Sequence, residues 1–221
     1  MDIDEIKAGM GGITWYHKIN LGHGLVTPGM DDTPTRIGRL EIPDDLTGMS
    51  VLDIGAWDGA LSFAAERRGA TRVLATDSYC WSGEGWGTKD GFEFARTALD
   101  SKVEDLDIDV LELSPERIGT FDLVLFVGVL YHMRHPLLAL ERVASVTERL
   151  LILDTHVAML EYEKPAMIFY PDAELKNDPS NWWGPNPAAV EAMLGTVGFS
   201  SFERKNPWTI RHGSFILHAQ R

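Results

Sequence analysis

The chain has 221 residues, 44% of them hydrophobic, which predicts one packed domain and argues against disorder. Lys and Arg number 20 against 33 Asp and Glu, and the resulting net charge of −13 disfavours an extensive phosphate-binding surface. The single cysteine, Cys80, excludes an internal disulfide and a cysteine-clustered zinc site. No apolar run approaches the ~20 residues that span a bilayer. The acidic segment 1–5 lacks the basic and apolar regions of a signal peptide, so we expect a cytoplasmic protein with no membrane partner.

The first 47 residues are rich in glycine and show little periodicity, apart from a short helix expected before Gly9. From residue 48, strand-like and helix-like segments alternate, which predicts an α/β fold with a mostly parallel sheet. The expected strands are 50–54, 72–76, 109–113, 121–127 and 150–154, and the expected helices are 61–68, 92–99 and 136–148.

Residues 155–185 interrupt this alternation with prolines and aromatic residues, and an insertion of this length is usually functional. Asn186 and Pro187 then predict the start of a helix that continues to Val197. Two strands follow, around Phe202 and over 215–219, which we expect to pair antiparallel at a sheet edge. The fold prediction is a Rossmann-like, doubly wound, mostly parallel seven-stranded sheet with an antiparallel C-terminal strand and an N-terminal cap.

The segment 51–59, Val-Leu-Asp-Ile-Gly-Ala-Trp-Asp-Gly, leads a buried strand into a glycine turn before a helix. Glycine lets a ligand approach the backbone, and a helix N-terminus favours a negative group such as a carboxylate. The G-x-G-x-x-G fingerprint is absent and Trp57 stands mid-turn, which disfavours NAD and FAD. Asp77 ends the next strand, where an acid can accept hydrogen bonds from both ribose hydroxyls. Together with the strand-ending acid Asp53, these residues predict a nucleoside cofactor.

Over residues 48–221 the sequence resembles the class I S-adenosylmethionine-dependent methyltransferases, whose glycine turn it matches except at Trp57. The segments 15–19 (Trp-Tyr-His-Lys-Ile), 27–29 (Thr-Pro-Gly) and 128–132 (Gly-Val-Leu-Tyr-His) are similar to a bacterial group identified as tRNA wobble-uridine (5-methoxyuridine or carboxymethoxyuridine) methyltransferases. That narrower resemblance fades after Asp154.

The resemblance implies S-adenosylmethionine as cofactor. It also implies cofactor contacts from Gly55, Asp77, Val110, Leu111, Val127 and Tyr131, with Trp15 and Lys18 closing over the site. The remaining expected cofactor residues are their neighbours Asp53, Ala56, Trp57, Gly59 and Ser78. On this interpretation the single domain comprises a cap or lid (1–47), a cofactor-binding core (48–154), an acceptor-binding insertion (155–185) and a C-terminal helix with edge strands (186–221).

Methyl transfer to a hydroxyl needs a base, and the candidates follow the central strands. His132 is the first choice because it directly follows Tyr131; in the alternative reading it packs the loop before Pro136. His135 lies in the same loop. Asp154 and His156, after the next strand, form a second candidate group. A divalent metal between these two is conceivable, but nothing in the spacing demands it, and we expect no metal site.

The aromatic residues Tyr170, Trp182 and Trp183 of the insertion are expected to contact the acceptor. Trp81 and Trp86 fall in a glycine-rich loop where the adenosine should lie, and Trp208 is expected to pack an edge strand.

Three functions follow as hypotheses. The leading one is methylation of a hydroxyl on a small sugar-derived or phenolic acceptor, which agrees with the acidic charge. The second is methylation or carboxymethylation of a tRNA wobble uridine, which needs a local basic face that the net charge disfavours. The third is a cofactor-binding regulator without catalysis. The sequence leaves the oligomeric state open.

Overall fold

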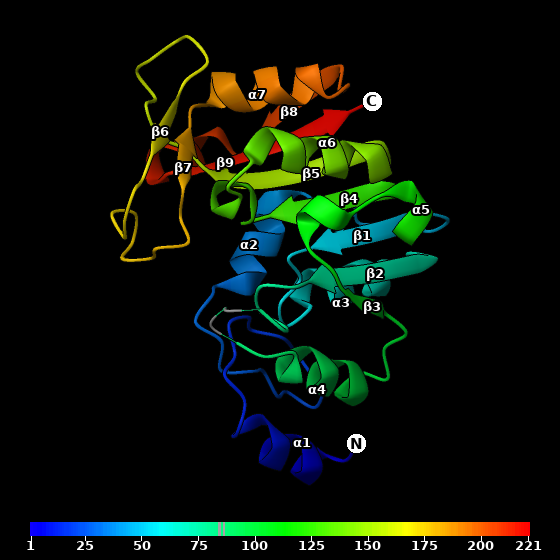
Figure 1. The fold of residues 1–221 in the computed structure, drawn as a ribbon. Helices are drawn as coiled ribbons and strands as arrows, with labels where there is room; N and C mark the ends of the chain where they lie inside the picture. Colours follow the sequence, from blue (N-terminus) through cyan, green and yellow to red (C-terminus); the bar gives the residue numbers. More distant parts are fainter. Residues whose placement is uncertain (84, 86) are drawn as a thin grey trace. The chain divides into compact units, whose positions relative to one another are not determined.

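The computed structural model describes residues 1–83, 85 and 87–221, and Figure 1 shows its helices and strands coloured along the chain. Trp86, expected near the adenosine, lies outside the described residues. The chain divides into two compact units, unit 1 from Met1 to Asp109 and unit 2 from Val110 to Arg221.

Unit 1 contains a parallel arrangement of strands with helices before and between them. Its elements are α1 (Ile3–Met10), α2 (Thr33–Leu40), β1 (Ser50–Ile54), α3 (Ala60–Arg67), β2 (Arg72–Asp77), α4 (Asp90–Ala98) and β3 (Glu104–Asp107). Strand β2 lies between β1 and β3, with Ile54 opposite Thr76 and Asp77 opposite Asp107. The carboxyl ends of β1 and β2 therefore meet at one edge.

Unit 2 carries the remaining strands and the insertion. Its elements are η1 (Val110–Glu112), α5 (Pro115–Ile118), β4 (Phe121–Val127), η2 (Leu130–His132), α6 (Pro136–Val146), β5 (Thr147–His156), β6 (Met167–Phe169), β7 (Trp183–Pro185), α7 (Pro187–Thr196), β8 (Ser201–Lys205), η3 (Pro207–His212) and β9 (Ser214–Gln220). Strands β4 and β5 are parallel, with Val127 opposite Asp154, and β9 pairs antiparallel with both β5 and β8.

The strand order β3-β2-β1-β4-β5-β9-β8 is that of a seven-stranded sheet, in which β9 runs antiparallel to both of its neighbours, β5 and β8. The predicted Rossmann-like fold class is confirmed. The insertion adds a separate antiparallel pair, β6 and β7, which lies beyond one end of β5 and β9 in Figure 1.

The prediction of the third strand at residues 109–113 is wrong. Residues 109–113 do not form a strand; 110–112 form the 3-10 helix η1, and the strand is Glu104–Asp107. This strand is at the sheet edge and carries acids that pair with cations: Arg72 binds Glu104 at 2.9 Å, and Asp105 binds Lys89 and Arg96. An edge strand buries little apolar surface, so hydrophobicity does not mark it.

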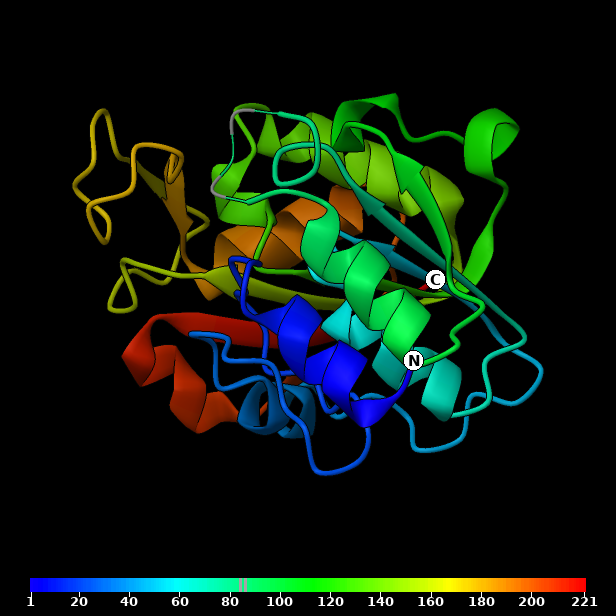
Figure 2. The same cartoon turned by 90° about the horizontal axis from the view of Figure 1, so that it is seen from below.

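The N-terminal region is more ordered than its composition predicts. Helix α2 was not expected, and α1 begins at a capping box in which the Asp2 side chain accepts the Glu5 N–H while the Glu5 side chain accepts the Asp2 N–H. Trp15 is 4% exposed; its indole N–H donates to the Met10 carbonyl at 3.1 Å, and its ring meets Phe94 of α4 edge-on at 6.1 Å. Figure 2 shows α1 lying alongside α4.

Three local predictions in unit 2 have different outcomes. Asn186 caps α7 as predicted, since its side chain accepts the Ala189 N–H at 2.8 Å. Helix α6 ends at Val146, two residues early, because the backbone is already extended at Thr147. Trp208 lies in η3 and is 50% exposed, and its packing against an edge strand stays a prediction. No helix among the described residues has both the length and the apolar character needed to cross a membrane.

Candidate functional site

The glycine turn of unit 1 is held against the end of β2 by its own backbone. The N–H groups of Gly55 and Ala56 both donate to the Thr76 carbonyl, at 2.8 and 3.0 Å. Asp77 accepts the Trp57 N–H on one carboxylate oxygen and the Cys80 N–H on the other, both at 3.0 Å. Burial raises the pKa of Asp77 above its usual range. The structure thus brings the predicted turn and the predicted strand-ending acid together.

Gly59 is required by the turn for two reasons. Its φ of +84° lies in the left-handed region that disfavours other residues. A Cβ there would also meet Phe92 and Phe63 at 2.6 and 2.9 Å, ring atoms packed in the core. Ala56, three residues earlier in the turn, is also buried.

Trp57 adopts φ +46°, a strained conformation for a bulky residue, and several contacts hold it there. Its ring stacks on Tyr16 with 4.5 Å between centroids and 4° between planes, and its carbonyl accepts the Trp81 indole N–H at 2.8 Å. A Cβ on Gly87 would lie 2.5 Å from the Trp57 indole nitrogen. The N-terminal segment and the glycine-rich loop therefore enclose the turn from two sides.

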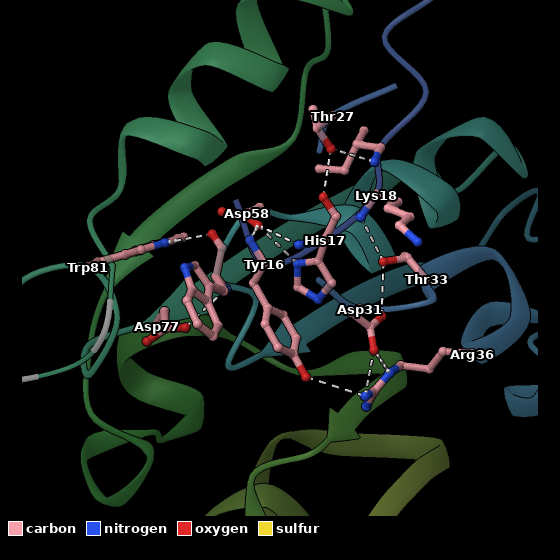
Figure 3. A network of polar contacts seen from close by, with 12 residues as sticks. Tyr16, His17, Lys18, Thr27, Asp31, Thr33, Arg36, Asp58, Asp77 and Trp81 are labelled. Atoms are coloured by element: carbon pink, nitrogen blue, oxygen red, sulfur yellow. Dashed lines mark hydrogen bonds and ion pairs between the residues drawn. The ribbon is translucent and has the colours of Figure 1, made fainter. Parts of the chain in front are cut away.

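Asp58 ties the N-terminal segment to the turn, a role that sequence reasoning missed. It is fully buried, and one carboxylate oxygen accepts the backbone N–H groups of Tyr16 and His17, both at 2.8 Å (Figure 3). Figure 3 also shows Tyr16 reaching toward Arg36, which is paired with Asp31 at 2.8 Å. The position of Asp58 within the glycine motif was the available signal, but its partners lie 41 and 42 residues away.

Lys18 is exposed, and its backbone N–H donates to Thr33 at 2.9 Å, which fixes the chain while leaving the ammonium in solvent. Ser78 is half-buried directly after Asp77. Cofactor contact by either residue, or by the buried Trp15, stays a prediction.

Asp53 lies within β1, and its carboxylate faces helix α3. It is 2% exposed, and its Oδ2 accepts the Ser62 hydroxyl at 2.6 Å. Burial raises the pKa of Asp53 to about 6, although the Ser62 hydrogen bond opposes the shift. The carboxylate therefore stabilises the strand–helix connection, and its direct contact with a cofactor stays a prediction.

Asp53→Asn should change how the unfolding free energy depends on pH. Between pH 3.8 and about 6 the folded protein retains a proton that the unfolded chain has lost, so the stability from this group is complete below pH 3.8 and falls as pH rises. Asparagine does not titrate. The unfolding free energy of wild type relative to Asp53→Asn, measured with urea, should decrease by about 3 kcal/mol between acidic and neutral pH. Asp44→Asn, at an exposed position, should show no such trend; a constant difference for Asp53→Asn would contradict the assignment.

The predicted cofactor residues of unit 2 occupy different elements. Val127 ends β4 and is half-buried, and Tyr131 is half-buried in η2. Val110 and Leu111 lie in η1, also half-buried, rather than in the strand predicted for them. Their contact with a cofactor stays a prediction.

His132 lies in η2 and contacts the insertion. Its Nδ1 lies 3.1 Å from the Ser180 carbonyl oxygen and 2.9 Å from the Ser180 hydroxyl, and that hydroxyl donates to Asp178 at 2.6 Å. The Tyr131 ring lies 4.2 Å from the His132 ring. Burial lowers the pKa of His132, so its imidazole is neutral at pH 7. Asp178 and Ser180 were not predicted, because nothing in the sequence pairs them with His132, which precedes Ser180 by 48 positions.

His156 and Asp154, the second candidate group, both have partners within unit 2. Nδ1 of His156 donates to the Gly213 carbonyl at 3.1 Å, and its Nε2 accepts the Tyr170 hydroxyl at 3.2 Å. Burial lowers the pKa of His156 and raises that of Tyr170. Asp154 is largely buried and accepts the Ser214 hydroxyl at 2.7 Å. His135, at the start of α6, is exposed.

An aromatic pocket of about 240 Å³ lies in unit 2, lined by Arg134, Phe169, Trp182 and Trp183. The Arg134 guanidinium lies 4.7 Å over the Trp182 ring, and the Phe169 ring lies 5.1 Å from that of Trp183. The structure brings the predicted Trp182 and Trp183 together here and adds Arg134 and Phe169. Tyr170 is held at His156 instead of lining this pocket.

Two buried polar side-chain atoms of residues 181–183 have no hydrogen-bond partner among the described residues: the indole nitrogen of Trp183, a residue of the pocket lining, and Oδ1 of Asn181. A buried polar atom without a partner costs about 1–3 kcal/mol, so such atoms mark places where water or a ligand binds. In the described part of the chain, no cluster of three or more His, Cys, Asp or Glu residues is arranged to hold a metal ion.

Comparisons with known proteins agree with this fold. A family model described as "Methyltransferase domain" matches residues 30–199, more than half of the chain. No curated protein has a matching sequence.

Several solved structures are similar. The N-terminal domain of EvdMO1, crystallised in the presence of SAH and D-fucose, has a TM-score of 0.72 at 21% identity, over 100% of this chain and 97% of that one. Magnesium protoporphyrin IX methyltransferase (ChlM) from Synechocystis PCC 6803, with bound SAH, has a TM-score of 0.58 at 19% identity, over 86% and 81% of the two chains. The 1,6-didemethyltoxoflavin-N1-methyltransferase of Burkholderia thailandensis has a TM-score of 0.56 at 16% identity, over 79% and 72%. At these identities the likeness shows the fold.

Proposed function

The chain belongs to the family of methyltransferase domains, and we propose that it transfers a methyl group from S-adenosylmethionine to a hydroxyl on the ring of a small sugar-derived or phenolic acceptor. One observation in unit 2 carries this proposal. The loop with Trp182 is joined to the segment with His132, because the Trp182 N–H donates to the Tyr131 carbonyl at 2.9 Å and Ser180 contacts His132. A candidate base and an aromatic surface thus occur in one hydrogen-bonded structure.

The groups of unit 1 fit S-adenosylmethionine. A carboxylate has about four lone-pair sites, so Asp77 retains acceptor capacity for the ribose beyond its backbone donors Trp57, Ser78 and Cys80. The glycine turn and the start of α3 present backbone to the amino-acid part, which contains a carboxylate. We infer that Asp77, Gly55 and Gly59 hold the cofactor, with Trp57 and the N-terminal segment around Lys18 covering it.

When bound, S-adenosylmethionine supplies an electrophilic methyl group whose transfer to a hydroxyl oxygen releases the hydroxyl proton. His132 is the proposed acceptor of that proton. It is neutral at pH 7 because burial lowers its pKa, and a neutral imidazole can take up a proton. His156 is the weaker candidate, because its Nε2 already accepts the Tyr170 hydroxyl.

The aromatic pocket is the proposed acceptor site. Its volume of about 240 Å³ is below the ~300–1,000 Å³ of pockets for drug-sized ligands, which favours an acceptor of about one ring. Aromatic faces suit the apolar face of a sugar or a phenol. D-Fucose, present in crystals of the EvdMO1 N-terminal domain, is a ring of this size and the first acceptor to test.

Labelled methyl transfer tests the proposal. The purified protein and methyl-labelled S-adenosylmethionine are incubated with D-fucose, with p-hydroxybenzoate, or with tRNA lacking wobble-uridine methylation. We expect label on a small hydroxylated ring, and Trp182→Ala should raise KM for that ring about tenfold through loss of stacking. Trp208→Ala, which removes an exposed tryptophan of the same unit, is the matched control. Transfer to tRNA alone would support the wobble-uridine hypothesis and overturn this one, as would absence of transfer to every hydroxylated ring tried.

A further inference from the structure

The hydroxyl of Ser180 lies between a carboxylate and the His132 imidazole. Its oxygen is 2.6 Å from Asp178 Oδ1 and 2.9 Å from His132 Nδ1. The Ser180 carbonyl oxygen lies 3.1 Å from the same Nδ1. One imidazole nitrogen therefore faces two oxygens of a single residue.

The chemistry of these oxygens determines where the hydrogens lie. A carbonyl oxygen can only accept, so Nδ1 must carry a hydrogen to bond it. A carboxylate oxygen also only accepts, so the Ser180 hydroxyl hydrogen points to Asp178, and the hydroxyl turns a lone pair toward His132. Both contacts require the same neutral tautomer, with hydrogen on Nδ1 and the lone pair on Nε2.

We propose that Ser180 and Asp178 are positioning residues that hold His132 in the tautomer whose basic nitrogen is Nε2. This inference rests on the proposed function, in which Nε2 receives the proton of the methylated hydroxyl. The acceptor oxygen forms its bond to the methyl carbon, the carbon–sulfur bond breaks with its electron pair going to sulfur, and the proton passes to Nε2. The imidazolium then keeps its Nδ1–H bonded to Ser180 and returns the Nε2 proton to solvent.

The turn that presents Ser180 is anchored independently of His132. The Ser180 N–H donates to Asp178 Oδ1 at 2.9 Å, and the Asn181 side chain donates to the Leu175 carbonyl at 2.8 Å. The Trp182 N–H donates to the Tyr131 carbonyl at 2.9 Å. The imidazole therefore meets a preformed arrangement of acceptors, which is what orientation of a base requires.

The charges near His132 have opposite signs. The hydrogen bond to the Ser180 backbone carbonyl and the Asp178 carboxylate favour the imidazolium and raise the pKa, whereas burial and the Lys176 ammonium lower it, with burial the largest effect. Loss of the Asp178 charge should therefore lower the pKa of His132 further. The direction of this pKa change distinguishes a positioning role from a purely structural one, because a structural defect gives no reason for the pKa of His132 to fall.

The first test is the tautomer itself. Long-range proton–nitrogen NMR of histidine-labelled protein, with His132→Gln to assign the signals, distinguishes protonated Nδ1 from protonated Nε2. We expect His132 to carry hydrogen on Nδ1 at neutral pH. A His132 signal from the Nε2–H tautomer overturns the proposal. Because this measurement uses neither cofactor nor acceptor, it stands even if the proposed methyl transfer fails.

The second test compares Ser180→Ala, Ser180→Thr and Asp178→Asn with the charge-matched control Asp172→Asn, an exposed residue of the same insertion. Ser180→Ala and Asp178→Asn should each lower kcat about tenfold with KM nearly unchanged, and should move the acid limb of the pH–rate profile and the NMR titration of His132 to lower pH. Ser180→Thr keeps the hydroxyl, so its kcat, its pH–rate profile and its His132 titration should stay close to those of the wild type. Unchanged kcat and His132 titration in Ser180→Ala and Asp178→Asn overturn the proposal, as does an equal effect of Asp172→Asn.

Discussion

His132→Ala is expected to lower the rate of methyl transfer by about 10²–10⁴-fold, the range that a positioned general base contributes. The loss should fall on kcat more than on KM, because the imidazole is proposed to act on the reacting hydroxyl. Binding of S-adenosylhomocysteine, measured by calorimetry, should stay close to wild type, since the proposed cofactor groups of unit 1 are intact. Single-turnover kinetics with labelled S-adenosylmethionine measures the chemical step directly.

The same role for His132 predicts how the rate of methyl transfer by the wild-type enzyme depends on pH. Because burial lowers the pKa of His132, the base is deprotonated at neutral pH, and the rate should fall only as pH drops below the usual histidine value. His212→Ala removes an exposed histidine of unit 2 and is the control, with rate and profile unchanged. A His132→Ala enzyme with wild-type turnover would remove this residue from the mechanism and return attention to His156 and its partner Tyr170.

Asp77→Ala is expected to weaken binding of S-adenosylmethionine by about 10²-fold or more. Hydrogen bonds to a charged group contribute about 1.5–3 kcal/mol each, and a ribose offers two hydroxyls to this carboxylate. Because burial holds Asp77 in a site with little water, its hydrogen bonds are not weakened by solvent competition. Isothermal titration with S-adenosylmethionine and with S-adenosylhomocysteine gives the two dissociation constants.

The same carboxylate accepts the N–H groups of Trp57 and Cys80, so Asp77→Ala will also loosen the turn. Asp77→Asn is the finer variant, because it keeps the size of the side chain and one carbonyl acceptor but loses the charge. It should weaken cofactor binding while circular dichroism shows the folded protein. Asp44→Ala, at an exposed position of unit 1, should bind the cofactor normally. Wild-type affinity in folded Asp77→Asn would exclude Asp77 from the ribose site.

The family match over residues 30–199 confirms the predicted methyltransferase, while the wobble-uridine specificity stays a prediction. The apolar strand at 121–127 was located correctly, because a central strand is buried on both faces. The acidic edge strand Glu104–Asp107 was missed because ion pairs, rather than burial, accompany it.

The sequence by itself determined the fold class, the glycine turn and the acid at the end of β2. Each of these is encoded in neighbouring residues: continuous apolar strands, glycine where φ must be positive, and an acid at a fixed distance from the turn. Only the tertiary structure decided what the polar side chains bind. The Asp53 carboxylate accepts the Ser62 hydroxyl, and the Asp58 carboxylate accepts two backbone N–H groups that lie 41 and 42 residues earlier. The His132 imidazole contacts Ser180, which lies 48 residues later in the chain. Such pairs form between segments brought together by folding, and hydrophobic periodicity carries no information about them.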